Sequence, residues 1–134
     1  MSGSYLLDTD VMVPFLNGNV GIIELLDERD VYLSAIALGE LRFGAAKSSR
    51  VEQNRARVDR LEEMADVLDV TPRTSEVYGD VRMALKRKGR PIPENDIWIA
   101  AQAIQHGLIL VSKDRHFDHI DGLLLQRPPS SAEG

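Results

Sequence analysis

The segment that most constrains the fold is a short apolar run, Tyr5-Leu6-Leu7, which leads directly into the carboxylate of Asp8. Consecutive apolar residues without alternation are typical of a strand that is buried on both faces of a parallel sheet. A carboxylate at the end of such a strand lies close to the core, where an unpaired charge is costly in free energy. The position of Asp8 therefore predicts further groups nearby that make its charge tolerable.

Apolar runs and helical patterns alternate along the rest of the chain. Further strands are predicted at 31–33, 67–70, 108–111 and 123–125, the last at a sheet edge. Helices are predicted at 11–17, 20–28, 35–47, 51–65, 75–88, 96–106 and, as a short segment, 115–120, with N-caps at Ser34, Thr74 and Asn95. This alternation predicts the α/β class, as a single three-layer α/β/α sandwich with a mainly parallel sheet. In such sheets the functional crevice lies beyond the carboxyl ends of the strands.

The length and composition are those of one globular domain. A chain of 134 residues suffices for one core, and we expect a domain over residues 1–126 and a disordered tail at 127–134. The absence of cysteine excludes disulfides and thiolate metal sites within this chain. Neither a secretion signal nor an apolar run of membrane length is recognisable, so a cytoplasmic location is expected. The net charge of −5 argues against nucleic-acid binding through overall positive charge, but not against a local basic surface.

Four acids stand where a surface charge is not expected. Asp8 and Asp114 follow two predicted strands, so their carboxylates meet at one edge if those strands are neighbours. Glu40 lies within a helix, with apolar or small residues three and four positions away, so it is expected to be buried. Asp96 opens the most apolar helix, where the helix dipole favours a negative charge. Each acid alone has an ordinary alternative as a cap or ion-pair partner, but together the four predict a site.

The chemistry of these carboxylates favours a divalent cation. Carboxylates gathered in one crevice repel one another unless cations neutralise them. Oxygen ligands without cysteine or a pair of histidines suit Mg²⁺ or Mn²⁺, and one or two ions are expected. Two ions about 4 Å apart would activate a water and stabilise the leaving oxygen in phosphodiester hydrolysis. Asp118 is a candidate fifth acid of this site.

Other polar residues nearby are assigned lesser roles. Thr9 and Ser112 would either orient a carboxylate of the site or cap a turn. Asp10 is expected to cap the helix that follows it. The histidines are not expected to form a metal site, and His116 and His119 are placed at the surface.

Four sequence blocks resemble those of PIN-domain ribonucleases, and most closely the VapC-type toxins of bacterial and archaeal toxin–antitoxin pairs. The blocks occur in the family's order and cover nearly the whole chain, at 6–11, 33–44, 92–101 and 110–117. The resemblance implies a compact α/β/α sandwich with Mg²⁺- or Mn²⁺-dependent endonuclease activity on RNA. It implies that Glu40 positions or shares a second ion, and that metal is held by Asp8, Asp96 and Asp114.

The sequence departs mildly from the family pattern at two positions, and the resemblance also implies a set of partners. Asp10 stands where the family commonly has Asn, and Ser112 stands where Thr is common. The family implies a homodimer and a VapB-type antitoxin, assembled as a heterotetramer or a larger complex. The C-terminal segment of such an antitoxin lies over the active site and often places a basic side chain among the acids.

Basic residues near the predicted site would bind the RNA backbone. A cluster before the loop that leads to Asp96 would guide phosphates into the crevice, although solvated helix-end charges explain it equally well. The candidates are Arg42, Lys47, Arg50, Lys86, Arg87, Lys88 and Arg90.

Two other functions remain open from the sequence. Asp8-Thr9-Asp10 superficially resembles the motif of haloacid-dehalogenase phosphatases, in which the first Asp is the nucleophile. Against this, Val11-Met12 follows where a small or hydroxyl residue is expected, and Glu40 would have no role. The second alternative is a non-catalytic module whose acids only bind a basic partner.

Overall fold

A five-stranded parallel sheet forms the centre of the molecule, whose computed structural model describes residues 3–129. The strand order is β3-β2-β1-β4-β5, so β1 is central and β3 and β5 are the edges. The strands are β1 (Tyr5–Leu7), β2 (Val31–Ser34), β3 (Asp66–Leu68), β4 (Ile109–Val111) and β5 (Leu124–Gln126). The predicted parallel sheet and the predicted edge position of the last strand are confirmed.

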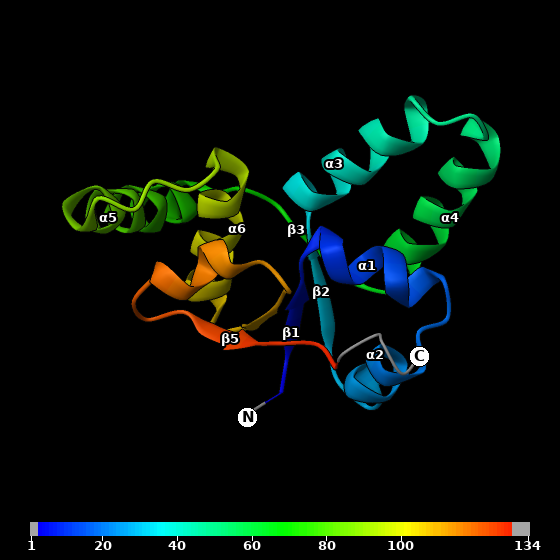
Figure 1. Cartoon of the computed structure of the whole chain (residues 1–134), viewed down its shortest axis with the longest axis horizontal. Helices are drawn as coiled ribbons and strands as arrows, with labels where there is room; N and C mark the ends of the chain where they lie inside the picture. Colours follow the sequence, from blue (N-terminus) through cyan, green and yellow to red (C-terminus); the bar gives the residue numbers. More distant parts are fainter. Residues whose placement is uncertain (1–2, 130–134) are drawn as a thin grey trace.

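Helices cover both faces of this sheet (Figure 1). They are α1 (Thr9–Leu16), α2 (Val20–Leu26), α3 (Ala35–Ala46), α4 (Val51–Glu63), α5 (Pro72–Lys88) and α6 (Glu94–His106), with a 3₁₀ helix, η1 (Arg115–His119). The right-handed crossovers from β1 to β2 and from β2 to β3 place α1–α4 on one face. The crossover from β3 back to β4 runs in the opposite direction, so α5 and α6 cover the other face. The three-layer α/β/α class is therefore confirmed.

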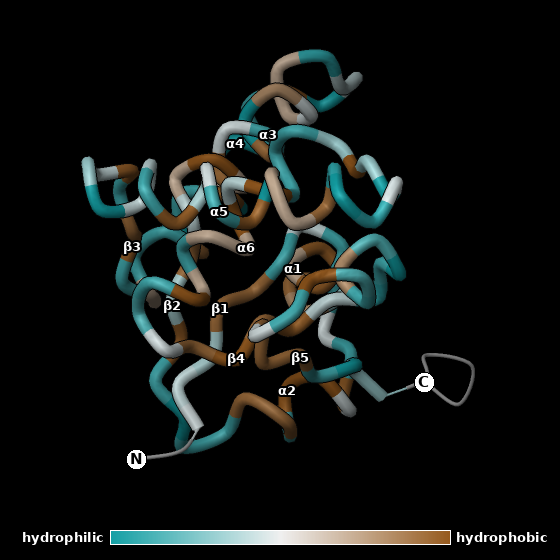
Figure 2. Tube along the Cα trace, turned by 90° about the vertical axis from the view of Figure 1, so that its left-hand side faces the viewer, coloured by the Kyte–Doolittle hydropathy of each residue, from teal (hydrophilic) through white to brown (hydrophobic). Residues whose placement is uncertain are grey.

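The core lies where the central strands meet the inner faces of the helices. Figure 2 shows hydrophobic residues along β1 and β4, with hydrophilic positions on the outer turns of the helices. Leu6 and Leu110 are paired across these strands and are fully buried, as the unbroken apolar runs predict. Leu7 pairs with Leu33 on β2 and with Val111 on β4, so β1 and β4 end level with one another and β2 ends one residue later. The residues that follow them are therefore brought to one edge of the sheet.

Three helices begin earlier than predicted: α1 begins at Thr9, and α5 and α6 begin earlier because their N-caps differ from the predicted ones. Helix α5 begins at Pro72 because Thr71, not Thr74, is its N-cap. The Thr71 hydroxyl accepts from the Thr74 amide at 3.4 Å, and the Thr74 hydroxyl accepts from the Thr71 amide at 3.0 Å. Helix α6 begins at Glu94 with Pro93 at the N-cap position, so the predicted cap Asn95 lies inside the helix. Ser34 is confirmed as the cap of α3, because its hydroxyl accepts from the Ile36 amide.

Thr71→Ala is expected to lower the free energy of unfolding by about 1 kcal/mol, because it removes the N-cap acceptor of the longest helix. Chemical denaturation of the wild type and the variant measures this difference. Ser49→Ala, at an exposed position outside the helices, is the matched control and should change stability far less. A Thr71 variant as stable as the control would contradict the assigned cap.

The end of the chain is only partly described. Arg127 belongs to the predicted tail, yet its guanidinium donates to the backbone oxygens of Ser112 and Asp114, each at 2.8 Å. Residues 130–134 of that tail lie outside the described residues. Within residues 3–129, none of the helices is both long and apolar enough to cross a membrane.

Candidate active site

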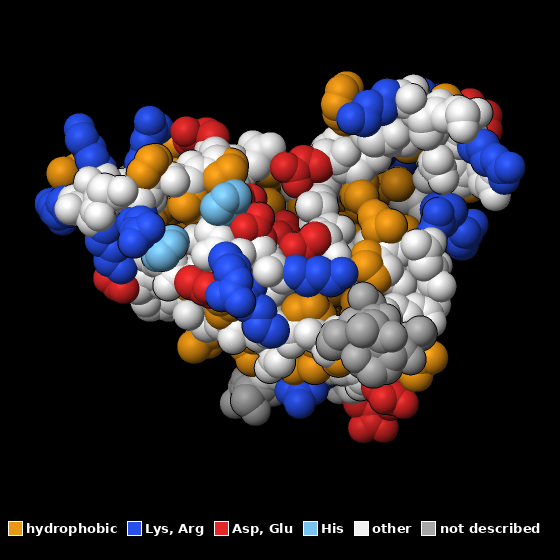
Figure 3. All heavy atoms as spheres, viewed as in Figure 1, with side chains coloured by type: hydrophobic (Ala, Val, Ile, Leu, Met, Phe, Trp, Pro, Cys, Tyr) orange, Lys and Arg blue, Asp and Glu red, His pale blue; other side chains and the backbone are white. Residues whose placement is uncertain are grey.

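An open acidic cleft lies beyond the carboxyl ends of β1 and β4. Figure 3 shows acidic side chains gathered in a hollow in the middle of the molecule, with a histidine and several basic side chains around them. The cleft has a volume of about 450 Å³. It is lined by Asp8, Thr9, Asp10, Glu40, Pro93, Glu94, Asn95, Asp96, Asp114 and His116. All four acids of the predicted site therefore line one cleft.

Asp8 is the most buried of these acids, with 4% of its surface exposed. It follows β1 and caps α1, accepting from the Thr9 amide at 2.9 Å through Oδ1. Its Oδ2 accepts from the Ser112 hydroxyl at 2.8 Å. Burial raises the pKa of Asp8 to about 6, and the nearby charges of Asp10 and Asp96 add to this rise, while the hydrogen bonds oppose it. The carboxylate is thus fixed in position but costly to ionise.

Ser112 links two of the strand ends. It is fully buried, and its hydroxyl donates to Asp8 while it accepts from the Asp114 amide at 3.0 Å. The residue follows β4, the neighbour of β1, so the bond depends on strand order. Two roles were predicted for Ser112, and the contacts for both are present. The bond to Asp8 orients a carboxylate, and the bond from the Asp114 amide caps a turn.

Asp10 does not cap α1, and this prediction is wrong. Asp8 holds the N-cap position, which places Asp10 within the first turn. Its carboxylate instead accepts from the Lys113 amide, at 3.1 Å through Oδ2. Burial raises the pKa of Asp10 above its ordinary value, and the bond to Lys113 opposes the rise. Asp10 therefore ties the start of α1 to the loop after β4.

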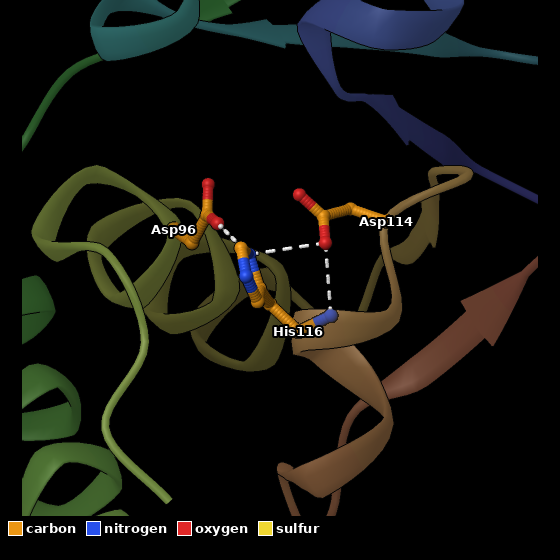
Figure 4. Close-up of side chains that lie close together, drawn as sticks. All are labelled: Asp96, Asp114 and His116. Atoms are coloured by element: carbon orange, nitrogen blue, oxygen red, sulfur yellow. Dashed lines mark hydrogen bonds and ion pairs between the residues drawn. The ribbon is translucent and has the colours of Figure 1, made fainter.

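Asp96, Asp114 and His116 form a tight cluster (Figure 4). His116 Nδ1 lies 3.0 Å from Asp96 Oδ2 and 3.0 Å from Asp114 Oδ1. The Asp114 carboxylate also caps η1 by accepting from the His116 amide at 2.9 Å. Burial raises the pKa of Asp96, the bond to His116 lowers it, and the charges of Asp114 and Glu40 raise it again. His116 is exposed, as predicted, and its imidazole is in contact with both acids.

Glu40 reaches the cleft from α3 and is exposed, contrary to the predicted burial. Its Oε2 accepts from the Asn95 amide group at 3.1 Å. The face of α3 that carries Glu40 also carries Phe43, which is 65% exposed. Helices α3 and α4 project from the body of the molecule as a hairpin (Figure 1), so the part of this face at Glu40 and Phe43 is exposed, whereas Ala37, one turn earlier, is buried in the core. The burial was inferred from apolar neighbours, and the sequence gives no signal for the open space beside them.

The other supporting candidates divide between the cleft and its surroundings. Thr9 lines the cleft, and its amide bonds Asp8. Asp118 is not among the lining residues and instead forms ion pairs with Arg127 and Arg115. The structure therefore does not bring this fifth acid to the four others.

The candidate RNA-binding residues also divide into two groups. Arg42 pairs with Asp59 and Glu62 on α4, at 2.8 Å each. Lys88 pairs with Asp121 at 2.8 Å and donates to the backbone oxygen of His119. The exposed members of the cluster without an ion pair in the described part of the chain are Lys86, Arg87 and Arg90.

Fold and cleft together define a class. A parallel α/β/α sandwich that gathers acids from four segments at the carboxyl edge of its sheet carries them where such sheets place their functional sites. The family model described as "PIN domain" matches residues 5–123 of this chain. The chain belongs to the PIN-domain family and, within it, resembles the VapC ribonucleases.

Relatives with curated names support this placement. Ribonuclease VapC2 of Rickettsia felis is 32% identical over 128 residues, which cover 91% of this chain and 96% of that protein. The tRNA(fMet)-specific endonuclease VapC of Shigella flexneri is 31% identical over 89% of this chain and 93% of its own length. Each alignment covers nearly the full length of both chains, so the similarity extends over most of each protein.

A solved structure agrees with this. The crystal structure of VapBC2 from Rickettsia felis, bound to a DNA fragment from the promoter, contains a chain with a TM-score of 0.85 and 31% identity. The match covers 93% of this chain and 98% of that chain. The resemblance to PIN-domain ribonucleases seen in the sequence is therefore confirmed at the level of family and fold.

Proposed function

We propose that this chain is a Mg²⁺- or Mn²⁺-dependent endoribonuclease and the toxin of a VapBC toxin–antitoxin pair. The observation that carries the proposal is the convergence of Asp8, Glu40, Asp96 and Asp114 on one cleft in a chain of the PIN-domain family. The names of its relatives, ribonuclease and endonuclease, support the reaction class.

The donor set of the cleft suits a hard divalent cation. Burial and mutual repulsion raise the pKa values of Asp8, Asp10 and Asp96, so a cation among these carboxylates would stabilise their charged forms. The candidate ligands of the cleft are carboxylate oxygens, and one imidazole nitrogen lies close to those of Asp96 and Asp114. Asp8, Asp96 and Asp114 would hold the metal, and Glu40 would share it directly or through water.

The protein's own contribution is to orient these groups before substrate arrives. When bound, divalent ions supply activation of a water and stabilisation of the charge that develops on the leaving oxygen. The Ser112 hydroxyl and the Thr9 amide fix the two oxygens of Asp8. Asn95 fixes Glu40 across the cleft. Water adds to phosphorus and the bond to the 3′ oxygen breaks, which leaves 5′-phosphate and 3′-hydroxyl ends.

Substrate and antitoxin would approach from the two sides of the cleft. Lys86, Arg87 and Arg90 lie close in sequence to the loop that leads to Asp96, and we propose that they bind RNA phosphates. A largely apolar groove of about 270 Å³ on the α1, α3 and α4 side is lined in part by Glu40, which also lines the acidic cleft. We propose that the antitoxin segment occupies this groove and places a basic side chain among the acids. A homodimer, and a heterotetramer or larger complex with the antitoxin, are part of the same proposal.

The proposal is tested with the purified protein and a mixture of cellular RNAs. Cleavage is expected with Mg²⁺ or Mn²⁺, should stop in EDTA, and should return when the ion is restored. Sequencing of the product ends should give 5′-phosphates. Cleavage that is unaffected by EDTA would overturn metal dependence, and no cleavage with any ion would favour the non-catalytic module. A phosphatase acting through Asp8 would instead form an aspartyl-phosphate without cutting RNA.

Metal binding should also stabilise the fold. Saturating Mn²⁺ at about 100 times its Kd is expected to add about 2.7 kcal/mol of stability, or a rise in Tm of several degrees. Asp96→Asn should lose most of this rise, because it removes a ligand with only 13% of its side chain exposed. Thermal melts with and without the ion measure the effect. An equal rise in the variant would mean that the ion binds elsewhere.

A further inference from the structure

We infer that the imidazole of His116 is a direct metal ligand of the cleft, and that it makes the site prefer Mn²⁺ to Mg²⁺. The inference rests on the proposed function, because it concerns the same ion. It adds a nitrogen donor to a site that sequence patterns describe by carboxylates alone. His116 enters the cleft from η1, Asp114 from the loop before it, and Asp96 from α6 (Figure 4).

The first observation is the position of the His116 Nδ1 atom between two carboxylates. It lies 3.0 Å from Asp96 Oδ2 and 3.0 Å from Asp114 Oδ1, and ligand atoms of all three residues lie within 4.8 Å of one another. An imidazole nitrogen has one lone pair or one proton, directed in the plane of the ring. Only the contact with Asp96 is a hydrogen bond, so a ring proton serves one of the two oxygens, whereas a cation between them would bind all three ligand atoms. Neighbouring ligands at about 2.1 Å in octahedral geometry are about 3 Å apart, which matches both separations.

The backbone holds this arrangement in place. Asp114 caps η1 by accepting from the His116 amide, so the spacing of two residues turns the imidazole back toward the capping carboxylate. Arg127 donates to the backbone oxygens of Ser112 and Asp114, at 2.8 Å each, and so restrains the loop from which the cluster is built. The imidazole is therefore positioned by the chain itself and does not depend on a bound ligand.

Donor chemistry then decides which ion is favoured. Mg²⁺ prefers oxygen donors and retains its waters, and it gains little from an imidazole. Mn²⁺ accepts nitrogen donors more readily while still accepting carboxylates. Exchange of one water for His116 would therefore raise the affinity for Mn²⁺ more than the affinity for Mg²⁺.

The test compares His116→Ala with the wild type, using Mn²⁺ alone and Mg²⁺ alone as probes. We expect His116→Ala to weaken Mn²⁺ binding at least about tenfold, since even indirect partners of a ligand set contribute about that much. Mg²⁺ binding, measured by calorimetry or by competition with Mn²⁺, should change by less than about threefold. His119→Ala is the matched control, because it removes a second histidine from the same 3₁₀ helix and outside the cluster. It should bind both ions as the wild type does.

Spectroscopy gives a readout that does not depend on activity. Pulsed electron paramagnetic resonance of Mn²⁺ in the wild type should show coupling to a directly bound nitrogen, and His116→Ala should lose it. Absence of nitrogen coupling in the wild type, or unchanged Mn²⁺ affinity in the variant, would overturn the inference. A rise in Mn²⁺ affinity would also overturn it, because His116 would then act as a competing cation.

The outcomes separate this inference from the proposed function. A wild type that binds Mn²⁺ and cleaves RNA, with a His116 variant of equal Mn²⁺ affinity, would refute the ligand role alone. A wild type that binds neither ion and cleaves no RNA would refute the nuclease itself. Circular dichroism confirms that the variant folds, which is expected because the His116 side chain is 46% exposed.

Discussion

Asp8→Asn is expected to lower the rate of RNA cleavage by about a hundredfold or more, the loss typical of removing one group that stabilises charge in the transition state. Asn has the shape of Asp, and its side-chain oxygen can accept from the Thr9 amide, while its NH2 group takes the place of the second oxygen and can donate to the Ser112 hydroxyl. The substitution therefore removes the charge and leaves the local geometry. The measurement is the initial rate on a defined RNA with saturating Mn²⁺.

The control for this prediction is Asp80→Asn, which makes the same chemical change at an exposed position on α5, outside the acidic cleft. It should cleave RNA at the wild-type rate. If Asp8→Asn were as active as this control, the assignment of Asp8 to the active site would be wrong. If both variants were inactive, the loss would come from a change in overall charge.

The same substitution, Asp8→Asn, is expected to stabilise the metal-free fold at neutral pH by about 1–3 kcal/mol. Folding raises the pKa of Asp8 from 3.8 to about 6, and each unit corresponds to about 1.4 kcal/mol. Below pH 4 the carboxyl is protonated in both the folded and the unfolded state, so it costs nothing. Between about pH 4 and pH 6 the folded state binds more protons than the unfolded state, so stability falls as pH rises. Above pH 6 the full cost is present.

Chemical denaturation in EDTA at pH 4 and at pH 7.5 measures this effect. The gain from Asp8→Asn should be present at pH 7.5 and should largely vanish at pH 4. Asp80→Asn should show no such dependence on pH. Saturating Mn²⁺ should reverse the order at pH 7.5, because the wild type gains binding energy that the variant loses. A variant less stable than the wild type at both pH values in EDTA would refute the electrostatic cost assigned to Asp8.

Much of the fold follows from local patterns. The unbroken apolar residues of β1 predict a strand buried on both faces, and Leu6 is fully buried in the centre of the sheet. The apolar character of α6 predicts a buried helix, and Ile99 and Ala100 have no exposed surface. These predictions succeed because hydrophobic burial depends mainly on residue type and period. The caps at Thr71 and Pro93 were missed because several polar residues stand near each helix start, and only backbone geometry chooses among them.

For the candidate site, some of the predictions from the sequence were correct and others were not. The four acids were found because each stands at a strand end or in an apolar helix, and all of them line the same cleft. Their catalytic roles stay a prediction. The predicted cap role of Asp10 and the predicted burial of Glu40 were wrong, because both depend on what the neighbouring segments place beside them. Arg127 was assigned to a tail, since nothing in its local sequence indicates the backbone oxygens that it contacts.

The sequence by itself determined the α/β class, the parallel sheet and the acids that meet at its carboxyl edge, because strand and helix signals are local and the edge rule is general. Only the tertiary structure decided the contacts that shape the cleft: Ser112 with Asp8, Asn95 with Glu40, and His116 with Asp96. These pairs are 104, 55 and 20 residues apart in the chain. Such contacts depend on strand order and helix placement, which the whole core determines together.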